Sequence, residues 1–112
     1  LRNAAGDRGL ALRFNKRELP AFAQWKNTAS SGDGYVTGLE PATDLPNAKP
    51  FERERGRLVR MEPSSTYTVQ LSLEAHDTVE GVRGVEQEIA NLQSQAARLV
   101  HPAPLGSFSP GR

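Results

Sequence analysis

The chain has 112 residues, with 14 lysine and arginine residues against 13 aspartate and glutamate residues and no cysteine. This length fits one ordinary domain or a piece of one. A formal charge of +1 from nearly equal counts of both signs gives no strong positive field, and binding a phosphate backbone needs a clustered excess of lysine and arginine, so nucleic acid is not an expected partner. The absence of cysteine excludes disulfides, thiolate zinc sites and thiol nucleophiles, and it fits a cytoplasmic protein.

The sequence shows no pattern typical of a membrane span, a leader or a cofactor site. No apolar run approaches the roughly 18 to 20 residues that span a bilayer, and Leu1 opens a polar stretch, so neither a membrane nor a signal peptide is expected. The start at Leu1 rather than Met indicates a processed product or a segment of a longer protein. There is no repeat, no glycine-rich phosphate loop and no metal-ligand spacing, so the sequence predicts no metal and no cofactor.

Alternating apolar residues predict two short strands in the first quarter of the chain. Residues 10–14 read Leu-Ala-Leu-Arg-Phe, a pattern typical of a half-buried strand. Pro20 opens a second strand that runs through Lys26, since proline is accepted at a first strand position. Residues 27–34 are rich in serine and glycine and predict a loop.

A third strand is predicted over residues 35–40, which carry aromatic and β-branched side chains and are followed by Pro41. Periodicity is lost in residues 42–56, which we predict to be a long loop. The charged run at residues 52–60 is predicted to be a solvated, internally paired surface. The alternative is an arginine that faces a substrate, because a guanidinium can bind sugar hydroxyls or a carboxylate through two hydrogen bonds.

The clearest strand signal lies in residues 66–74, where apolar and polar side chains alternate along the whole segment. We predict that residues 57–61 pair with it as a hairpin through a turn at residues 62–65, which contain proline and two serines. The fold class predicted from these segments is mainly β: an antiparallel β-sandwich fragment of about five strands with one C-terminal helix.

Beyond Asp77 the apolar spacing changes to three and four residues, which predicts a helix over residues 85–100 with Gly84 limiting its start. This helix is expected to dock on the sheet; the alternative is that its apolar stripe docks on a partner. The proline and glycine content of the last residues predicts disorder. The expected organisation is a β-sandwich segment at 1–77, a helical segment at 78–100 and a disordered tail at 101–112.

Residues that could carry chemistry lie at the ends of two predicted strands, in segments 24–26 and 38–41. If these strands pair, Trp25 and Glu40 lie in the same sheet. An indole packs against the C–H face of a pyranose, and a carboxylate accepts hydrogen bonds or a proton from its hydroxyls. We therefore predict a sugar site in which Gln24 and Trp25 bind substrate and Glu40 is catalytic. The alternatives are a core or interface role for Trp25 and a solvated surface role for Glu40.

Three further residues complete the candidate set. Gly38 is expected to leave open space beside the Glu40 carboxylate. His76 ends a predicted strand and His101 precedes a proline near the C-terminus, and both histidines are predicted to be exposed.

Four stretches of the sequence occur in an order that resembles a known family. They are Leu19–Lys26, Tyr35–Pro41, the charged loop Glu52–Gly56, and Met61-Glu62-Pro63 before an alternating strand. Together they resemble the C-terminal part of the aldose 1-epimerase (galactose mutarotase-like) superfamily, in particular its poorly characterised aldose 1-epimerase family branch. The resemblance covers roughly residues 10–77. It implies that the chain corresponds to the last third of a larger β-supersandwich.

The resemblance also implies a mechanism. In that family a carboxylate at the position of Glu40 takes the proton from the anomeric hydroxyl, while a histidine protonates the ring oxygen. The ring opens, the C1–C2 bond rotates, and the ring recloses as the other anomer. A glutamate is ionised at neutral pH and can serve as this base. The family's histidine comes from strands before the matched region, and neither His76 nor His101 corresponds to it.

The expected function is therefore the C-terminal part of a carbohydrate-binding, aldose 1-epimerase-like isomerase that interconverts sugar anomers and is inactive as an isolated fragment. Its expected partners are a monosaccharide or sugar derivative and the missing N-terminal strands of the parent protein. The first alternative is a non-catalytic carbohydrate-binding β module. The second is a structural interaction domain.

Overall fold

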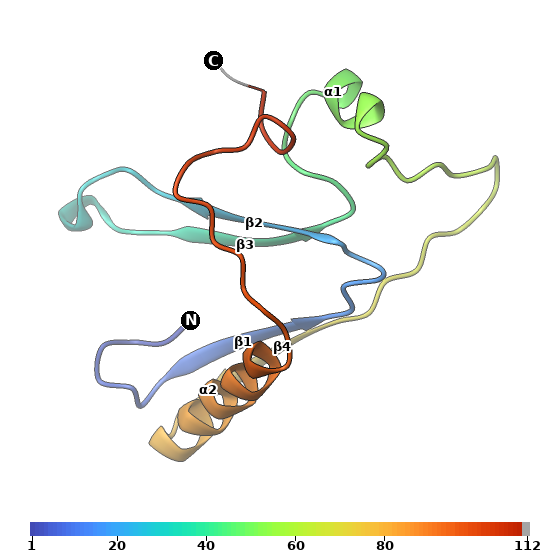
Figure 1. The fold of residues 1–112 in the computed structure, drawn as a ribbon. Helices are drawn as coiled ribbons and strands as arrows, with labels where there is room; N and C mark the ends of the chain where they lie inside the picture. The colour runs from blue at the N-terminus through green and yellow to red at the C-terminus, as the bar shows by residue number, and fades with distance from the viewer. Residues whose placement is uncertain (111–112) are drawn as a thin grey trace. The chain divides into compact units, whose positions relative to one another are not determined.

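The computed structural model describes residues 1–110, which contain four antiparallel strands in two small sheets and one main helix (Figure 1). The predicted mainly β class with a C-terminal helix is confirmed. The chain divides into two compact units: one contains Leu1–Arg13 and Leu71–Ala103, and the other contains Phe14–Gln70 and the segment from Pro104 onward. The last two residues of the predicted disordered tail lie outside the described residues.

The first unit is built on a sheet in which β1 (Gly9–Phe14) pairs with β4 (Leu71–His76). The predicted first strand is confirmed. The predicted hairpin between residues 57–61 and 66–74 is wrong, because only the second half of the alternating segment is a strand and its partner is β1. The described residues therefore contain four strands instead of five.

Hydrogen bonds that Glu18 accepts explain why the first half of that segment does not join a sheet. The Tyr67 hydroxyl donates to the Glu18 carbonyl, and the Gln70 amide donates to Glu18 Oε2 at 2.7 Å. A turn does form where it was predicted, since the Ser65 amide donates to the Glu62 carbonyl at 3.0 Å. Side-chain and turn hydrogen bonds here replace the expected strand ladder.

Helix α2 (Val79–Ser94) begins and ends six residues before the predicted helix. Its N-cap is Thr78, whose Oγ1 accepts a hydrogen bond from the Gly81 amide at 3.1 Å. A threonine cap satisfies an amide that the first helical turn leaves free, whereas glycine inside a helix costs only about 1 kcal/mol. Gly84 therefore lies within the helix instead of limiting its start.

Helix α2 lies against the sheet of the first unit, as expected (Figure 1). Val82 is 4% exposed and Ala11 is 9% exposed. A Cβ at Gly9 would lie 3.2 Å from Val82 Cγ2, so the absence of a side chain at Gly9 lets the helix approach the strand. Farther along the helix, Ile89 and Leu92 are exposed, so the packed face is confined to its first turns.

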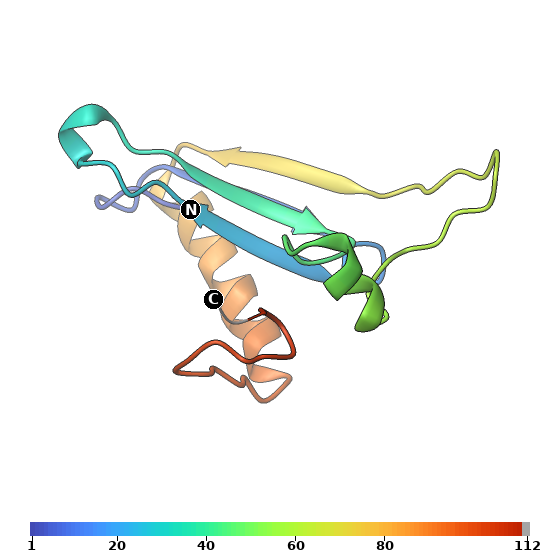
Figure 2. The same cartoon turned by 90° about the horizontal axis from the view of Figure 1, so that it is seen from above.

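The second unit contains an antiparallel hairpin of β2 (Ala21–Lys26) and β3 (Thr37–Ala42), with a 3-10 helix at Ser31–Asp33 in its loop. Figure 2 shows the two strands side by side and the short helix at the hairpin tip. The second and third predicted strands are confirmed, and they pair with each other as the predicted sugar site requires. Strand β3 lies two residues beyond the predicted span and includes Pro41, which a two-stranded sheet accepts because each of its strands is an edge strand.

The predicted loop at residues 42–56 contains a short helix, α1 (Lys49–Glu54). Pro50 lies in its first turn, where the missing amide proton costs nothing. Gly56 follows the helix with a φ of 69°, a left-handed conformation that glycine adopts without strain. The chain reverses direction there, which brings Arg57 back toward α1.

Candidate functional site

The register of the β2–β3 hairpin places the predicted sugar-binding tryptophan and the predicted base on one face. Trp25 pairs with Gly38, and Ala23 pairs with Glu40. Directly paired residues share a face, and so do residues two apart along a strand. Trp25 and Glu40 are therefore diagonal neighbours across the hairpin, a relationship that puts Cβ atoms within about 7 to 8 Å.

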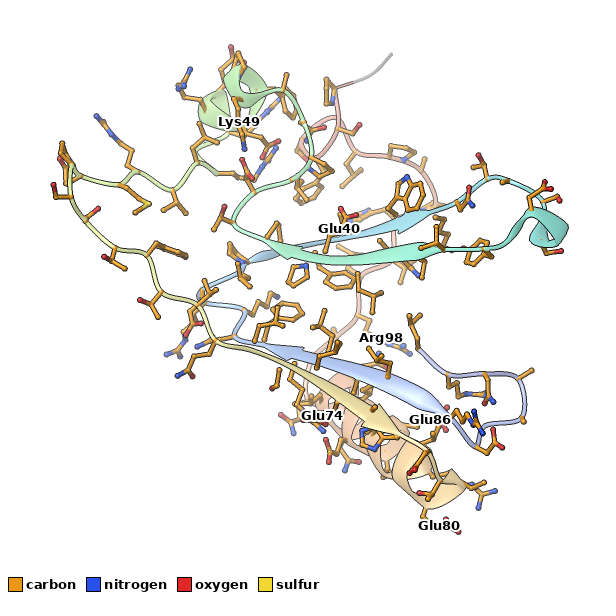
Figure 3. The ribbon with its side chains drawn as sticks, turned by 180° about the vertical axis from the view of Figure 1, so that it is seen from behind. Glu40, Lys49, Glu74, Glu80, Glu86 and Arg98 are labelled. Atoms are coloured by element: carbon orange, nitrogen blue, oxygen red, sulfur yellow. The ribbon has the colours of Figure 1, made fainter. Side chains whose placement is uncertain are left out.

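Gly38 gives the Glu40 carboxylate its position. A Cβ at residue 38 would overlap Glu40 Oε1, so the side chain of Glu40 folds back along β3 over the glycine. The sequence predicted open space beside the carboxylate at this point, and the carboxylate itself uses that space. Figure 3 shows Glu40 on β3 of the hairpin. Because Trp25 lies directly opposite Gly38, the Glu40 side chain extends along β3 toward the strand position that faces Trp25.

The hairpin face is accessible. Trp25 is 51% exposed and is not a core residue of the described chain. Its backbone carbonyl accepts a hydrogen bond from the Thr37 hydroxyl, which fixes the strand end that carries the indole. Among residues 1–110 the Glu40 carboxylate has no hydrogen-bond or ion-pair partner. The face therefore offers a flat apolar surface beside an acceptor that is free to bind a hydroxyl.

Gln24, the third predicted site residue, points to the other face of the hairpin. It pairs with Leu39, whereas Trp25 pairs with Gly38. The structure therefore does not bring Gln24 together with Trp25 and Glu40. The sequence held the necessary signal, because neighbouring residues in a strand always point to opposite faces.

A buried ion pair in the charged segment was missed by sequence reasoning. Glu52 is fully buried, and Arg57 Nε and Nη2 donate to its Oε2 and Oε1 at 2.7 Å each. Asn47 Nδ2 also donates to Oε1 at 2.7 Å. The prediction of a solvated surface is therefore wrong for Glu52, although internal pairing is confirmed.

The hydrogen bonds from Arg57 determine the charge state of this carboxylate. These bonds and the one from Asn47 together hold the pKa of Glu52 at about 2 and outweigh burial, which acts in the opposite direction. The same contact raises the pKa of Arg57. Because Arg57 binds Glu52 through Nε and Nη2 and the Ser107 carbonyl through Nη1, it is paired within the chain and does not fit the alternative of an arginine facing a substrate.

His76 is half-buried, so its predicted exposure is wrong, whereas His101 is exposed as predicted. The Nε2 atom of His76 is buried without a hydrogen-bond partner in the described chain and lies 3.6 Å from Glu74 Oε2. Glu74 accepts a hydrogen bond from Arg13 at 2.7 Å, which holds the pKa of this carboxyl below its ordinary value. His76 and His101 both belong to the first unit, so neither lies on the unit that carries the hairpin.

Ion pairs in the first unit join its N-terminal segment to α2. Arg2 pairs with Glu86 at 2.6 Å, and Arg13 pairs with both Glu74 and Glu88 at 2.7 Å. Figure 3 labels Glu74 on β4 and Glu86 on α2. Within residues 1–110 no group of three or more histidine, aspartate or glutamate residues could hold a metal ion. These charges therefore connect the strands to the helix.

The fold and the hairpin define a mainly β chain with an exposed aromatic and acidic face. The chain belongs to the family described as a domain of unknown function, DUF4432, whose model matches residues 1–75. This match includes Trp25, Glu40 and the Glu52–Arg57 pair and ends before α2. No match was found among curated proteins, and none among solved structures. No helix in the described part of the chain is long and apolar enough to cross a membrane.

Proposed function

We propose that this chain is the C-terminal part of a carbohydrate-binding, aldose 1-epimerase-like isomerase and that the hairpin face binds a monosaccharide. The observation that carries the proposal is the register that places Trp25 and Glu40 on one face beside Gly38. The resemblance of the sequence to the aldose 1-epimerase superfamily supplies the reaction. A cytoplasmic location is part of the proposal and rests on the cysteine-free composition.

The chemistry assigned to this chain is binding and proton removal. The Trp25 indole packs against the apolar face of the pyranose, and Glu40 accepts the proton of the anomeric hydroxyl. The O–H electron pair then forms the carbonyl at C1 while the bond between C1 and the ring oxygen breaks. The ring oxygen takes a proton from an acid, and reclosure from the other face of the carbonyl gives the other anomer.

The general acid is not assigned to a residue of this hairpin. The family resemblance expects a histidine from strands that precede the matched region, and the hairpin itself has none. The proposal is therefore that this chain contributes the base and part of the sugar surface. The isolated chain is expected to bind sugar weakly and to show almost no mutarotation.

A second candidate is a non-catalytic carbohydrate-binding β module. It is favoured by the absence, among residues 1–110, of any hydrogen bond that orients the Glu40 carboxylate. A general base usually depends on such positioning, whereas a binding surface requires only an accessible indole and an acceptor. Both candidates use the same residues, so they differ in chemistry and not in location.

Trp25 fluorescence tests the site that both candidates share. Trp25 is the only tryptophan of the chain, so an aldose that stacks on it should change the emission at millimolar concentration. Trp25→Ala should abolish binding measured by NMR titration. Gln24→Ala is the matched control, because this neighbour lies on the opposite face and its loss should leave sugar binding intact. An unchanged emission across a panel of aldoses would contradict both candidates.

Polarimetry on freshly dissolved α-anomers separates the two candidates in a longer natural protein that contains this sequence. Catalysed interconversion that is lost in Glu40→Gln would support the isomerase. Sugar binding with no acceleration over the uncatalysed rate would support the binding module.

A further inference from the structure

The C-terminal segment Leu105–Ser109 docks on the cluster around the buried ion pair of the second unit. The segment forms a turn in which the amides of Phe108 and Ser109 both donate to the Leu105 carbonyl, at 2.9 and 3.0 Å. Arg57 Nη1 donates to the Ser107 carbonyl at 2.7 Å. Asn47 Nδ2 donates to the Phe108 carbonyl at 3.0 Å. Figure 1 shows this segment beside α1.

The two donors that hold this turn are the same side chains that bind Glu52. Arg57 directs Nε and Nη2 to the carboxylate, which leaves Nη1 for the turn. Asn47 Nδ2 donates both to Glu52 Oε1 and to the turn. Because both side chains are hydrogen-bonded to Glu52, the carboxylate holds the two donors in place independently of the turn. Donors that are already in place lose little conformational freedom on binding.

Aromatic contacts give the docking site its selectivity. The Arg57 guanidinium lies 5.6 Å from the centroid of the Phe51 ring and 5.9 Å from that of Phe108. Both distances are within the range of a cation–π interaction. Phe108 remains 54% exposed, so it rests on the cluster and is not enclosed by it. A contact of this kind can open without disrupting a hydrophobic core.

We propose that Asn47, Phe51 and Arg57 form a docking surface for an aromatic turn peptide and that its occupant is the chain's own segment 105–109, acting as a separable latch. The surface binds two consecutive backbone carbonyls and one ring, so it requires a turn with an aromatic residue at position 108. The residues of the docking surface lie within the region that matches the family, residues 1–75, and the latch lies outside it. Covalent attachment keeps the latch at a high effective concentration.

The test uses the full chain and a synthetic peptide of residues 102–110, PAPLGSFSP. Phe108→Ala should shift the NMR signals of the Asn47 side-chain amide and of Arg57 Nε–H. The peptide should bind this variant at least tenfold more tightly than it binds the wild-type chain, whose site is already occupied, and should restore both signals. A peptide with alanine at the position of Phe108 should not bind. Ser107→Ala is the matched control in the chain, because only its backbone carbonyl is used.

Several outcomes would overturn the latch. One is identical Asn47 and Arg57 signals in the wild-type chain and Phe108→Ala. Another is failure of the peptide to bind a Phe108→Ala chain whose spectrum remains well dispersed. If Phe108→Ala does not fold, nuclear Overhauser contacts between the Phe108 ring and the Arg57 side chain decide the matter in the wild-type chain. Their presence supports the docked turn, and their absence refutes it.

Discussion

Trp25 on β2 and Gly38 on β3 are direct cross-strand partners, so the indole has no side chain opposite it. The space that a side chain at residue 38 would fill holds the carboxylate of Glu40. One glycine therefore both exposes the indole and sets the direction of the acid.

Gly38→Ala should move the Glu40 carboxylate away from Trp25 without unfolding the hairpin. The atom displaced is the end of a flexible side chain, and alanine is favoured over glycine in a strand, so the free energy of unfolding should stay within about 1 kcal/mol of the wild-type value. The carboxyl carbon signal of Glu40 should shift, and sugar affinity should fall. Gly32→Ala, in the loop of the same hairpin, is the control and should change neither quantity. An unmoved Glu40 signal would show that Gly38 does not position the acid.

Glu40→Gln should lower the rate of anomer interconversion by about 10²- to 10⁴-fold in a longer natural protein that contains this sequence, because general base catalysis has that magnitude. Sugar affinity should change little, since the amide keeps the shape and one acceptor oxygen. Polarimetry measures the rate, and Trp25 fluorescence measures the affinity. Glu62→Gln, an exposed glutamate outside the hairpin, is the control. A Glu40→Gln protein with an undiminished rate would remove the assigned role.

Glu52 should make stability depend on acidic pH. Its pKa falls from an ordinary 4.5 to about 2 in the folded chain, chiefly through its hydrogen bonds with Arg57. A carboxyl group with a lowered folded pKa stabilises the fold above its unfolded pKa and loses that effect as pH falls through the folded pKa. The urea concentration at the unfolding midpoint should therefore decrease as the pH is lowered from 4.5 to 2.

The matched variant for this pH dependence is Glu52→Gln. It should be less stable than the wild-type chain at neutral pH and should lose less stability on acidification. Some slope should remain, because Glu74 also has a lowered pKa through its bond with Arg13. Equal pH dependence of the urea midpoints in both chains would contradict the assigned role of the ion pair.

Thr78→Ala should destabilise α2 by about 1 kcal/mol, the usual cost of losing an N-cap side chain. Thr78→Ser keeps the hydroxyl and should behave as the wild-type chain. Circular dichroism during thermal unfolding measures both. Equal stability of the alanine and serine variants would show that the Thr78 hydroxyl does not cap the helix.

Local patterns predicted the fold well where strand partners are close in sequence. The β2–β3 hairpin joins two short predicted strands with a predicted serine- and glycine-rich loop between them. The segment at residues 66–74 had a stronger alternating pattern and was still assigned the wrong partner. Its strand pairs with β1, which is far away in the sequence, and its first half is held by Glu18. Alternation identifies a strand face but does not identify the neighbouring strand.

The candidate site shows the same division between local and non-local information. The shared face of Trp25 and Glu40 could be predicted once the hairpin was assumed, and the opposite direction of Gln24 could have been predicted as well. The burial of Glu52 could not be predicted from the sequence, because charged residues are almost never fully buried unless they are paired. Its partner Arg57 is reached only through the left-handed turn at Gly56.

The connection from β1 to β4 has a kinetic consequence. Between these paired strands the chain forms the whole β2–β3 hairpin and α1, so the larger part of the second unit, Phe14–Gln70, is an insertion within the first. A hairpin joins residues close in sequence, whereas pairing β1 with β4 closes a loop of more than fifty residues, and loop closure costs more entropy as the loop grows. The hairpin should therefore fold before β1 pairs with β4. During synthesis, strand β1 remains unpaired until Leu71–His76 has been made.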